Sequence, residues 1–127
     1  MRHARYVRLY TDETGETHFE DLEVALAPVN FAPPAAPLDI AQFVPTTQSF
    51  WVGASVGWAG DTPHPTPQRQ LFCTLQGEYE VTASDGSIRR FPPGSVLILE
   101  DTWGKGHSTH IIGEIDTLVF GVALADL

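Results

Sequence analysis

The five histidines are the side chains of this sequence best suited to chemistry at neutral pH. An unperturbed imidazole changes its charge near pH ~6.5, so it can give or take a proton, and its neutral ring nitrogen binds first-row transition metals. His64 opens the segment 64–70, and His107 follows a lysine between two glycines. Acid–base chemistry and metal ligation are the two functional interpretations, and hydrogen bonding inside a buried site is the structural one.

The elements that position these residues must be short and numerous. The chain has 127 residues, a hydrophobic share of 43%, ten prolines and eleven glycines. This length suits one domain with one core, and the many turn residues favour a β-sandwich or barrel over a helix bundle. The one cysteine, Cys73, allows no intrachain disulfide, and we expect it to be a small buried core residue.

The net charge of −9, from sixteen acidic and seven basic residues, argues against two classes of partner. A strongly acidic surface repels both phosphate backbones and anionic lipid headgroups, so we expect neither nucleic acid nor a membrane as partner. Residues 1–6 have no apolar segment after their charges and do not resemble a signal peptide. We therefore expect a cytoplasmic protein.

At the N-terminus, β-forming residues at 6–10 and 17–26 flank a turn signal and predict a β-hairpin. Residues 27–37 contain four prolines. Proline has no donor for a ladder, so we interpret this stretch as an extended arm lying over the barrel or along a neighbour. Residues 38–44 are predicted to form one helical turn.

From residue 48 onward, short apolar or alternating runs are separated by turn signals. This spacing is typical of a sandwich or closed barrel. The predicted organisation is 1–47, a hairpin and proline-rich arm packing on the barrel, and 48–127, the barrel, in one structural domain overall. Strands are predicted at 48–56, 69–75, 78–83, 87–91, 95–99, 107–112 and 117–123, and the segment 57–67 is predicted to be a turn region.

The segment 64–77 resembles the first motif of the cupin superfamily, in which a His-x-His pair, a glutamate and a glycine follow at fixed spacing. His64 matches the first histidine, and Gly77 matches the closing glycine. Thr66 stands in place of the second histidine, and Gln70 stands in place of the glutamate.

The second cupin motif is also partly present. Residues 91–99 look like its Pro-Gly turn and apolar strand, and Gly104 and His107 keep its glycine–histidine step, slightly late. The resemblance covers roughly residues 48–124. It implies an all-β fold, a double-stranded β-helix (jelly-roll) cupin barrel with a central pocket, here with an N-terminal β-hairpin and proline-rich arm.

A typical cupin presents three histidines and a glutamate to a divalent transition metal. The resemblance implies a pocket floor of His64, Thr66, Gln70 and His107, because residues two apart on a strand share a face. With one imidazole and the carboxylate lost, metal affinity falls by several kcal/mol, from the ~10–16 kcal/mol of structural sites. No cofactor is firmly expected, and a divalent transition metal, if bound, would be held by His64, Gln70 and His107.

Other residues are assigned to the same pocket. Phe72 shares a strand face with the pocket floor, and Trp58 and Trp103 flank the two motif loops. We interpret these three as substrate-binding residues together with Thr66 and Gln70, which could hydrogen-bond a carbonyl or hydroxyl group. Core packing is the alternative for the tryptophans. Glu100 or Asp101, from the loop before His107, would strengthen a metal site.

The remaining histidines are placed elsewhere. His110 is an odd number of residues from His107, so it is expected to face away from the pocket. His18 lies on the predicted hairpin, near its strand partner or a subunit interface, and His3 belongs to the N-terminal tail.

Three functions remain open at this stage. The first is a non-redox isomerase, cyclase or lyase that uses His64 and His107 as catalytic acid and base. The second is a non-catalytic module that binds or senses a small molecule. The third is a metal-dependent cupin enzyme with an atypical site. The expected partner is a small-molecule ligand, and the arm suggests a homodimer, because it has little core of its own and needs a surface to cover.

Overall fold

The computed structural model describes residues 2–126, and this part of the chain consists of strands, turns and extended segments without a helix. A helix long and apolar enough to cross a bilayer is accordingly absent from the same residues. The strands are β1 (Arg2–Thr11), β2 (Thr17–Val29), β3 (Leu38–Ile40), β4 (Thr46–Ala54), β5 (Ala59–His64), β6 (Gln70–Gln76), β7 (Glu78–Ala83), β8 (Ile88–Phe91), β9 (Val96–Leu99), β10 (His107–Ile112) and β11 (Thr117–Leu124).

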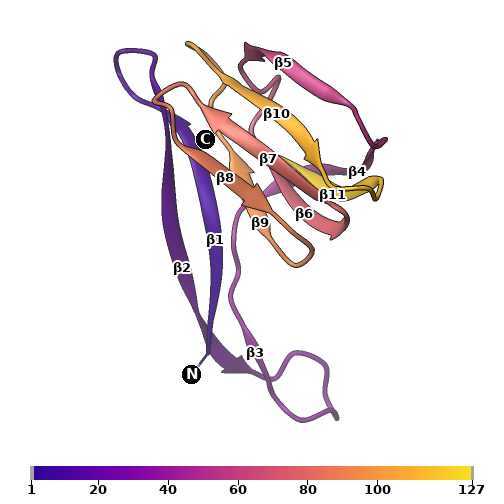
Figure 1. The fold of residues 1–127 in the computed structure, drawn as a ribbon. Helices are drawn as coiled ribbons and strands as arrows, with labels where there is room; N and C mark the ends of the chain where they lie inside the picture. Colours follow the sequence, from indigo (N-terminus) through magenta and orange to yellow (C-terminus); the bar gives the residue numbers. More distant parts are fainter. Residues whose placement is uncertain (1, 127) are drawn as a thin grey trace.

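Strands β4 to β11 form a jelly roll, which confirms the predicted all-β fold of the cupin type. Four of them lie in the larger sheet in the order β4-β11-β6-β9, and the other four form the smaller sheet in the order β5-β10-β7-β8. The chain therefore changes sheet at every connection from β4 to β11 except that between β7 and β8, as in two interlocked Greek keys. Figure 1 shows the two sheets facing each other.

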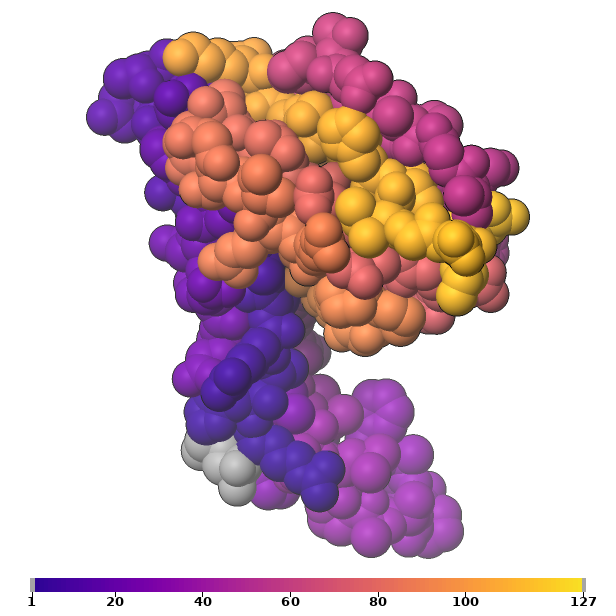
Figure 2. Space-filling view, in the orientation of Figure 1, coloured from indigo at the N-terminus to yellow at the C-terminus, as the bar shows by residue number. Residues whose placement is uncertain are grey.

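The predicted N-terminal hairpin is confirmed and extends the larger sheet. β1 pairs with β2 in antiparallel fashion along its whole length and runs parallel to β9, with Val7 opposite Leu97. The far end of the hairpin, with β3 and residues 30–37, leaves the barrel as a separate lobe (Figure 2). The division at residue 47 stays a prediction.

Two local expectations were wrong. The helical turn at 38–44 is instead strand β3, because β2 continues three residues beyond its predicted end and offers its edge at Ala27 to Val29. The segment 57–67 is not wholly a turn, since it contains β5, which pairs with β10. Consequently His64 ends a strand of the smaller sheet, while Gln70 begins a strand of the larger one.

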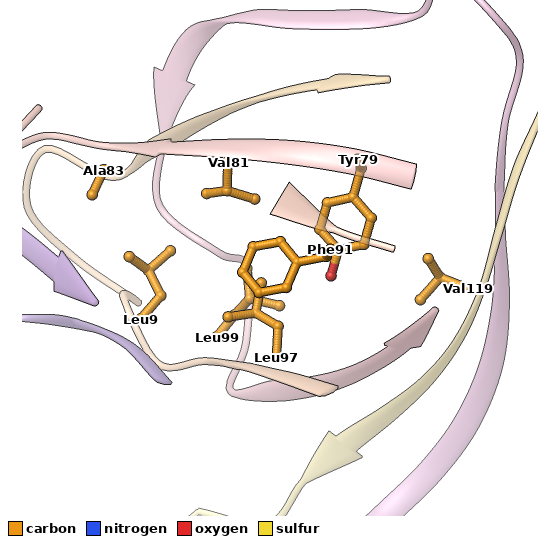
Figure 3. Packing of buried hydrophobic residues seen from close by; sticks show 8 residues of the cluster. All are labelled: Leu9, Tyr79, Val81, Ala83, Phe91, Leu97, Leu99 and Val119. Atoms are coloured by element: carbon orange, nitrogen blue, oxygen red, sulfur yellow. The ribbon is translucent and has the colours of Figure 1, made fainter. Parts of the chain in front are cut away.

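The core lies between the sheets and closes one end of the barrel. Leu9, Leu97 and Val81 are almost completely buried, and the ring of Tyr79 stacks on that of Phe91 at 5.1 Å between centroids. Figure 3 shows these side chains converging from both sheets. These side chains fill the space between the two sheets at this end of the barrel.

Candidate functional site

A pocket with a volume of about 260 Å³ opens between the two sheets beyond the core. Its polar residues come from both sheets and include two of the five histidines. Six residues assigned from the sequence line it together: Trp58, His64, Thr66, Gln70, Phe72 and His107. The other lining residues are mainly apolar, with Tyr79, Thr109 and Thr117 as further polar groups; the apolar ones include Val52, Ala54, Val81, Leu99, Ile111 and Val119.

His107, the first residue of β10, is held by a buried carboxylate. Its ring atom Nδ1 lies 2.6 Å from Oδ2 of Asp101, which is 0% exposed, and His107 itself is 5% exposed. The second carboxylate oxygen, Oδ1 of Asp101, is buried and has no partner within residues 2–126. A carboxylate so placed orients the imidazole and stabilises the imidazolium that forms when the ring accepts a proton.

A glycine allows His64 to approach His107. Gly106 has a φ of +72°, and a Cβ there would lie 2.1 Å from the carbonyl carbon of His64. With no side chain at Gly106, β10 begins directly against the end of β5, where His107 pairs with His64. The two imidazole centroids are therefore 5.3 Å apart, with the ring planes at 50°.

Hydrogen bonds fix the same tautomer in both rings. Nδ1 of His64 lies 2.8 Å from the carbonyl oxygen of Pro65, which can only accept, so Nδ1 carries the proton. Nδ1 of His107 donates in the same way to the Asp101 carboxylate. In the neutral form of each ring, Nε2 is left with its lone pair. Two neighbouring rings thus offer acceptors to whatever occupies the pocket.

Thr66 and Gln70 form a short polar chain beside the histidines. The Thr66 hydroxyl donates to the carbonyl oxygen of Gln68 at 2.9 Å, so it can only accept from the Gln70 amide, at 3.0 Å. This assignment leaves Oε1 of Gln70 as an acceptor. The Thr66 backbone N–H donates to the Asp101 carbonyl at 3.0 Å and ties the loop after β5 to the loop after β9.

The pocket contains no side chain with a permanent charge. Its titratable groups are the two imidazoles and the Tyr79 hydroxyl. Burial raises the pKa of Tyr79 well above its usual value, so that hydroxyl stays protonated. Trp58 is half exposed at the open side and lies against Gly60 of β5.

Two residues considered for the site lie elsewhere. Trp103 does not line the pocket and instead packs beside Gly15 in the hairpin turn, because the β9–β10 loop folds towards β1 and β2. Glu100 points away, bound to Arg8 and Arg69. Burial opposes ionisation of Glu100, but these two hydrogen bonds outweigh it and lower its pKa.

The other histidines also stand apart from the pocket, as expected for His110. Its Nε2 lies 2.6 Å from the exposed Asp61 carboxylate. His18 bonds to Asp12 at 2.6 Å and to Asp85 at 2.9 Å, and so connects the hairpin turn to the β7–β8 turn. His3 lies on β1 in the protruding lobe.

The donor set fits a tightly held divalent metal poorly. His64, Gln70 and His107 line the pocket, whereas Asp101 lies outside the lining and bonds to Nδ1 of His107. Across residues 2–126, no group of three or more histidine, cysteine or acidic side chains is arranged to hold an ion. Two imidazoles and a neutral amide carbonyl are fewer and weaker ligands than the three or four nitrogen, sulfur or carboxylate ligands of ordinary zinc sites.

Sequence reasoning considered Asp101 only as a metal ligand and missed its bond to His107. The available signal was an acidic residue at the end of an apolar strand, just before the loop that leads to the histidine. Only the folding back of β10 shows which ring nitrogen this carboxylate contacts.

No protein-family model matches this chain, and no curated protein matches it. Among solved structures, the cupin domain of Schizosaccharomyces pombe Cnp3 is similar to it, with a TM-score of 0.47 and 20% identity, over 97% of this chain and 84% of that one. The classification depends on the strand order and on the pocket between the two sheets. On these grounds the chain is a jelly-roll barrel of the cupin fold.

Proposed function

We propose that this protein binds a small neutral organic molecule in the barrel pocket and transfers a proton on it, with His107 as base and His64 as its acid partner. The single observation that carries the proposal is the buried Asp101–His107 pair, 2.6 Å apart, in which His107 lines the pocket and Asp101 does not. Burying a carboxylate destabilises a fold unless the carboxylate is paired, and even a paired one stabilises a core less than apolar side chains do. The Asp101–His107 pair is therefore better explained by a role in function than by core packing.

The pocket argues for a small and uncharged ligand. At about 260 Å³ it lies below the ~300–1000 Å³ of sites for drug-sized molecules. It offers no lysine or arginine for a carboxylate or phosphate and no free carboxylate for an amine. Apolar walls with a few acceptors and donors suit a ketone, a hydroxyketone or a similar neutral compound.

The histidine pair supplies both partners of a proton transfer when His107 is neutral and His64 carries a second proton, on Nε2. Nε2 of His107 takes a proton from a carbon next to a carbonyl, and the electron pair moves to the carbonyl oxygen. Protonated Nε2 of His64 gives its proton to that oxygen and produces an enol. In a hydroxyketone this enol is an enediol. His107 returns its proton to the former carbonyl carbon, while His64 takes the proton of the other hydroxyl, whose oxygen becomes the new carbonyl, and both rings are restored. Asp101 stabilises the His107 imidazolium in between.

The test is hydrogen–deuterium exchange into small ketones. Hydroxyacetone, cyclopentanone and acetophenone are incubated with the protein in deuterated buffer, and loss of the signal from the carbon-bound hydrogens is followed by proton NMR. We expect exchange with at least one probe, reduced by ~10²–10⁴-fold in His107→Gln and by a smaller factor in His64→Gln. His110→Gln is the matched control, because His110 also pairs with an aspartate but lies outside the pocket.

Two results would support the other functions. Binding of a probe, seen as ligand-induced shifts of pocket resonances, without exchange would favour a binding or sensing module. Stoichiometric metal in the purified protein, with exchange that depends on it, would favour a metal-dependent enzyme. One observation favours the metal-dependent enzyme. Both rings have the tautomer in which metal-binding histidines are usually held, with Nδ1 donating to a protein oxygen.

A further inference from the structure

The turn of the N-terminal hairpin lies along the loop that separates Asp101 from His107. Groups of this loop bond to the hairpin at successive points, so the two segments follow each other (Figure 1). The bonds run from Glu100 N–H to the Leu9 carbonyl at 2.8 Å, from the Thr11 hydroxyl to the Trp103 carbonyl at 3.0 Å, from Lys105 N–H to the Gly15 carbonyl at 2.9 Å, and from the Thr17 hydroxyl to the Gly106 carbonyl at 2.8 Å. The hairpin turn therefore holds the loop that leads to the proposed base.

Two glycines bring the backbones of the turn and the loop into direct contact. Gly15 and Gly104 have φ angles of +91° and +86°, a region that favours glycine. A Cβ at Gly104 would lie 2.6 Å from the carbonyl oxygen of Gly15 and 2.9 Å from its Cα. No side chain fits in so close a contact, so the loop rests on the backbone of the hairpin. Its position therefore depends on that of the turn.

Thr17, the first residue of β2, makes the buried bond of this contact. It is 0% exposed, and its hydroxyl oxygen lies 2.7 Å from the backbone nitrogen of Ser84 and 2.8 Å from the carbonyl oxygen of Gly106. An N–H can only donate and a carbonyl can only accept, so this hydroxyl accepts from Ser84 and donates to Gly106. The Thr17 backbone N–H donates in turn to Oγ of Ser84 at 2.7 Å. These bonds join the start of β2 to the end of β7 and to the residue before β10.

A charged pair at the surface supports the same contact. Oγ of Ser84 donates to Oε2 of Glu16 at 2.6 Å, and Nζ of Lys105 lies 3.1 Å from that oxygen. The hydrogen bond from Ser84, followed by that from Lys105, lowers the pKa of Glu16, so its carboxylate is ionised at neutral pH. The Lys105 side chain is 64% exposed, and exposed ion pairs contribute little to stability. The buried hydroxyl of Thr17 is therefore the main link between the turn and the residues next to His107.

The Thr17 bond acts on the peptide unit directly before His107. The Gly106 carbonyl and the His107 nitrogen belong to one planar unit, so the hydroxyl of Thr17 fixes the orientation of that unit. Gly106 is buried and lies against the backbone of His64, so a tilt of the unit displaces both rings of the pair. It also changes the bond between His107 and Asp101. A buried carbonyl left without a donor is destabilising, so loss of the hydroxyl favours such a tilt.

We propose that Thr17 is a positioning residue for His107, and that the turn of the N-terminal hairpin is thereby part of the functional site. The Thr17 hydroxyl fixes the peptide unit before His107 and so maintains the bond of the ring to Asp101 and its distance from His64. Thr17 does not line the pocket and acts only through His107. Its effect on proton transfer rests on the proposed function, whereas its effect on the position of the ring does not.

The experiment compares Thr17→Val, Thr17→Ser and Thr74→Val in the full chain. Valine has the shape of threonine without the hydroxyl, and serine keeps the hydroxyl. Thr74 is the matched control, because it is 1% exposed, its hydroxyl has no partner within residues 2–126, and it does not line the pocket. Nitrogen-15 and proton NMR follow the ring nitrogens and the Nδ1 proton of His107. Deuterium exchange into hydroxyacetone, cyclopentanone and acetophenone measures proton transfer, and urea unfolding measures stability.

The expected changes concern the ring of His107 first and the rate second. In Thr17→Val, the Nδ1 proton should exchange with water at least ~10-fold faster, because a weakened bond to Asp101 opens more often. Deuterium exchange into the ketone should fall ~10- to 100-fold, the effect of a displacement of up to ~1 Å. Thr17→Ser should restore most of both properties, and Thr74→Val should leave both as in the wild type.

A folded Thr17→Val that is less stable in urea but keeps the ring signals of the wild type shows a structural role only and overturns the proposal. An equal change of the ring in Thr74→Val also overturns it. If Thr17→Val does not fold, Thr17→Cys decides, because a thiol fits nearly the same space and donates only weakly. An unaltered His107 ring in that variant overturns the proposal. Absence of ketone exchange in the wild type overturns the proposed function alone, because the ring signals still test the positioning role.

Discussion

Replacing Asp101 by asparagine separates the function of the buried pair from its contribution to stability. The side chain is fully buried, so an isosteric substitution avoids a cavity. Oδ2 bonds to His107, while Oδ1 has no partner within residues 2–126. Asp101→Asn therefore removes a charge and one charge-assisted hydrogen bond and leaves the shape of the site unchanged.

Asp101→Asn should reduce the rate of proton transfer strongly but change the stability of the fold only slightly. A hydrogen bond to a charged group contributes ~1.5–3 kcal/mol, which corresponds to a ~10- to 150-fold loss of proton-transfer rate. If the amide NH₂ turns towards Nδ1 of His107, the tautomer inverts, and the loss approaches ~10⁴-fold, as for the same substitution in a catalytic triad. Stability should change by only ~1 kcal/mol, because relief of a buried, half-paired carboxylate offsets the lost hydrogen bond.

Deuterium exchange into the ketone that the wild type accepts measures the rate. Nitrogen-15 NMR of the imidazoles reads the tautomer of His107, and urea unfolding measures stability. Asp61→Asn is the control, because Asp61 makes an equally short bond to His110 at an exposed site. Unchanged exchange in a folded Asp101→Asn, with the Nδ1 proton of His107 retained, would refute the role we assign to this carboxylate.

Three further predictions test the fold and its electrostatics. Gly106→Ala places a side chain in the left-handed region, which costs ~1–2 kcal/mol, and overpacks the His64 backbone, which costs ~1–3 kcal/mol. Urea unfolding should therefore show a free energy of unfolding lower by ~2–5 kcal/mol, and NMR should show a displaced His64 ring. Leu97→Ala, fully buried in the core, should cost ~2–5 kcal/mol by the same assay, whereas an effect below 1 kcal/mol would contradict the packing. The hydrogen bond to Asp12, joined by that to Asp85, raises the pKa of His18 in the folded protein. The two ion pairs therefore contribute their full stabilisation at pH values below the unfolded-state pKa of ~6.5. This contribution is lost as the pH rises through the folded-state pKa of His18. His18→Gln should therefore destabilise the protein more at pH ~5.5 than at pH ~9, and an equal effect at both values would exclude the charged pair.

The sequence predicted most of the barrel because β-strands and turns depend on local signals. Alternating apolar residues and glycine or proline at the turns identified all the barrel strands except β5. β5 was missed because its six residues, Ala59–His64, include a proline and a glycine and few β-formers. It is a strand because β10 offers a ladder edge to it, and that contact joins residues distant in sequence.

For the site, the sequence indicated side chains but not their partners. His64, Thr66, Gln70, Phe72, Trp58 and His107 do line one pocket, whereas Trp103 lies outside it. The spacing of residues on a strand determines which side of the sheet they face, and this rule holds without knowledge of the fold. It cannot decide which loop folds back over which strand, and so it could not show that Trp103 and Glu100 lie outside the pocket.

By itself, the sequence determined the fold class, the order of the strands along the chain and the histidines available for chemistry, because these follow from periodicity and residue type. Only the tertiary structure decided that Asp101 holds His107 from behind, that Gly106 brings His64 beside it, and that Thr17 holds the peptide unit before His107. Each of these depends on contacts between residues far apart in the chain, which packing of the two sheets establishes all at once.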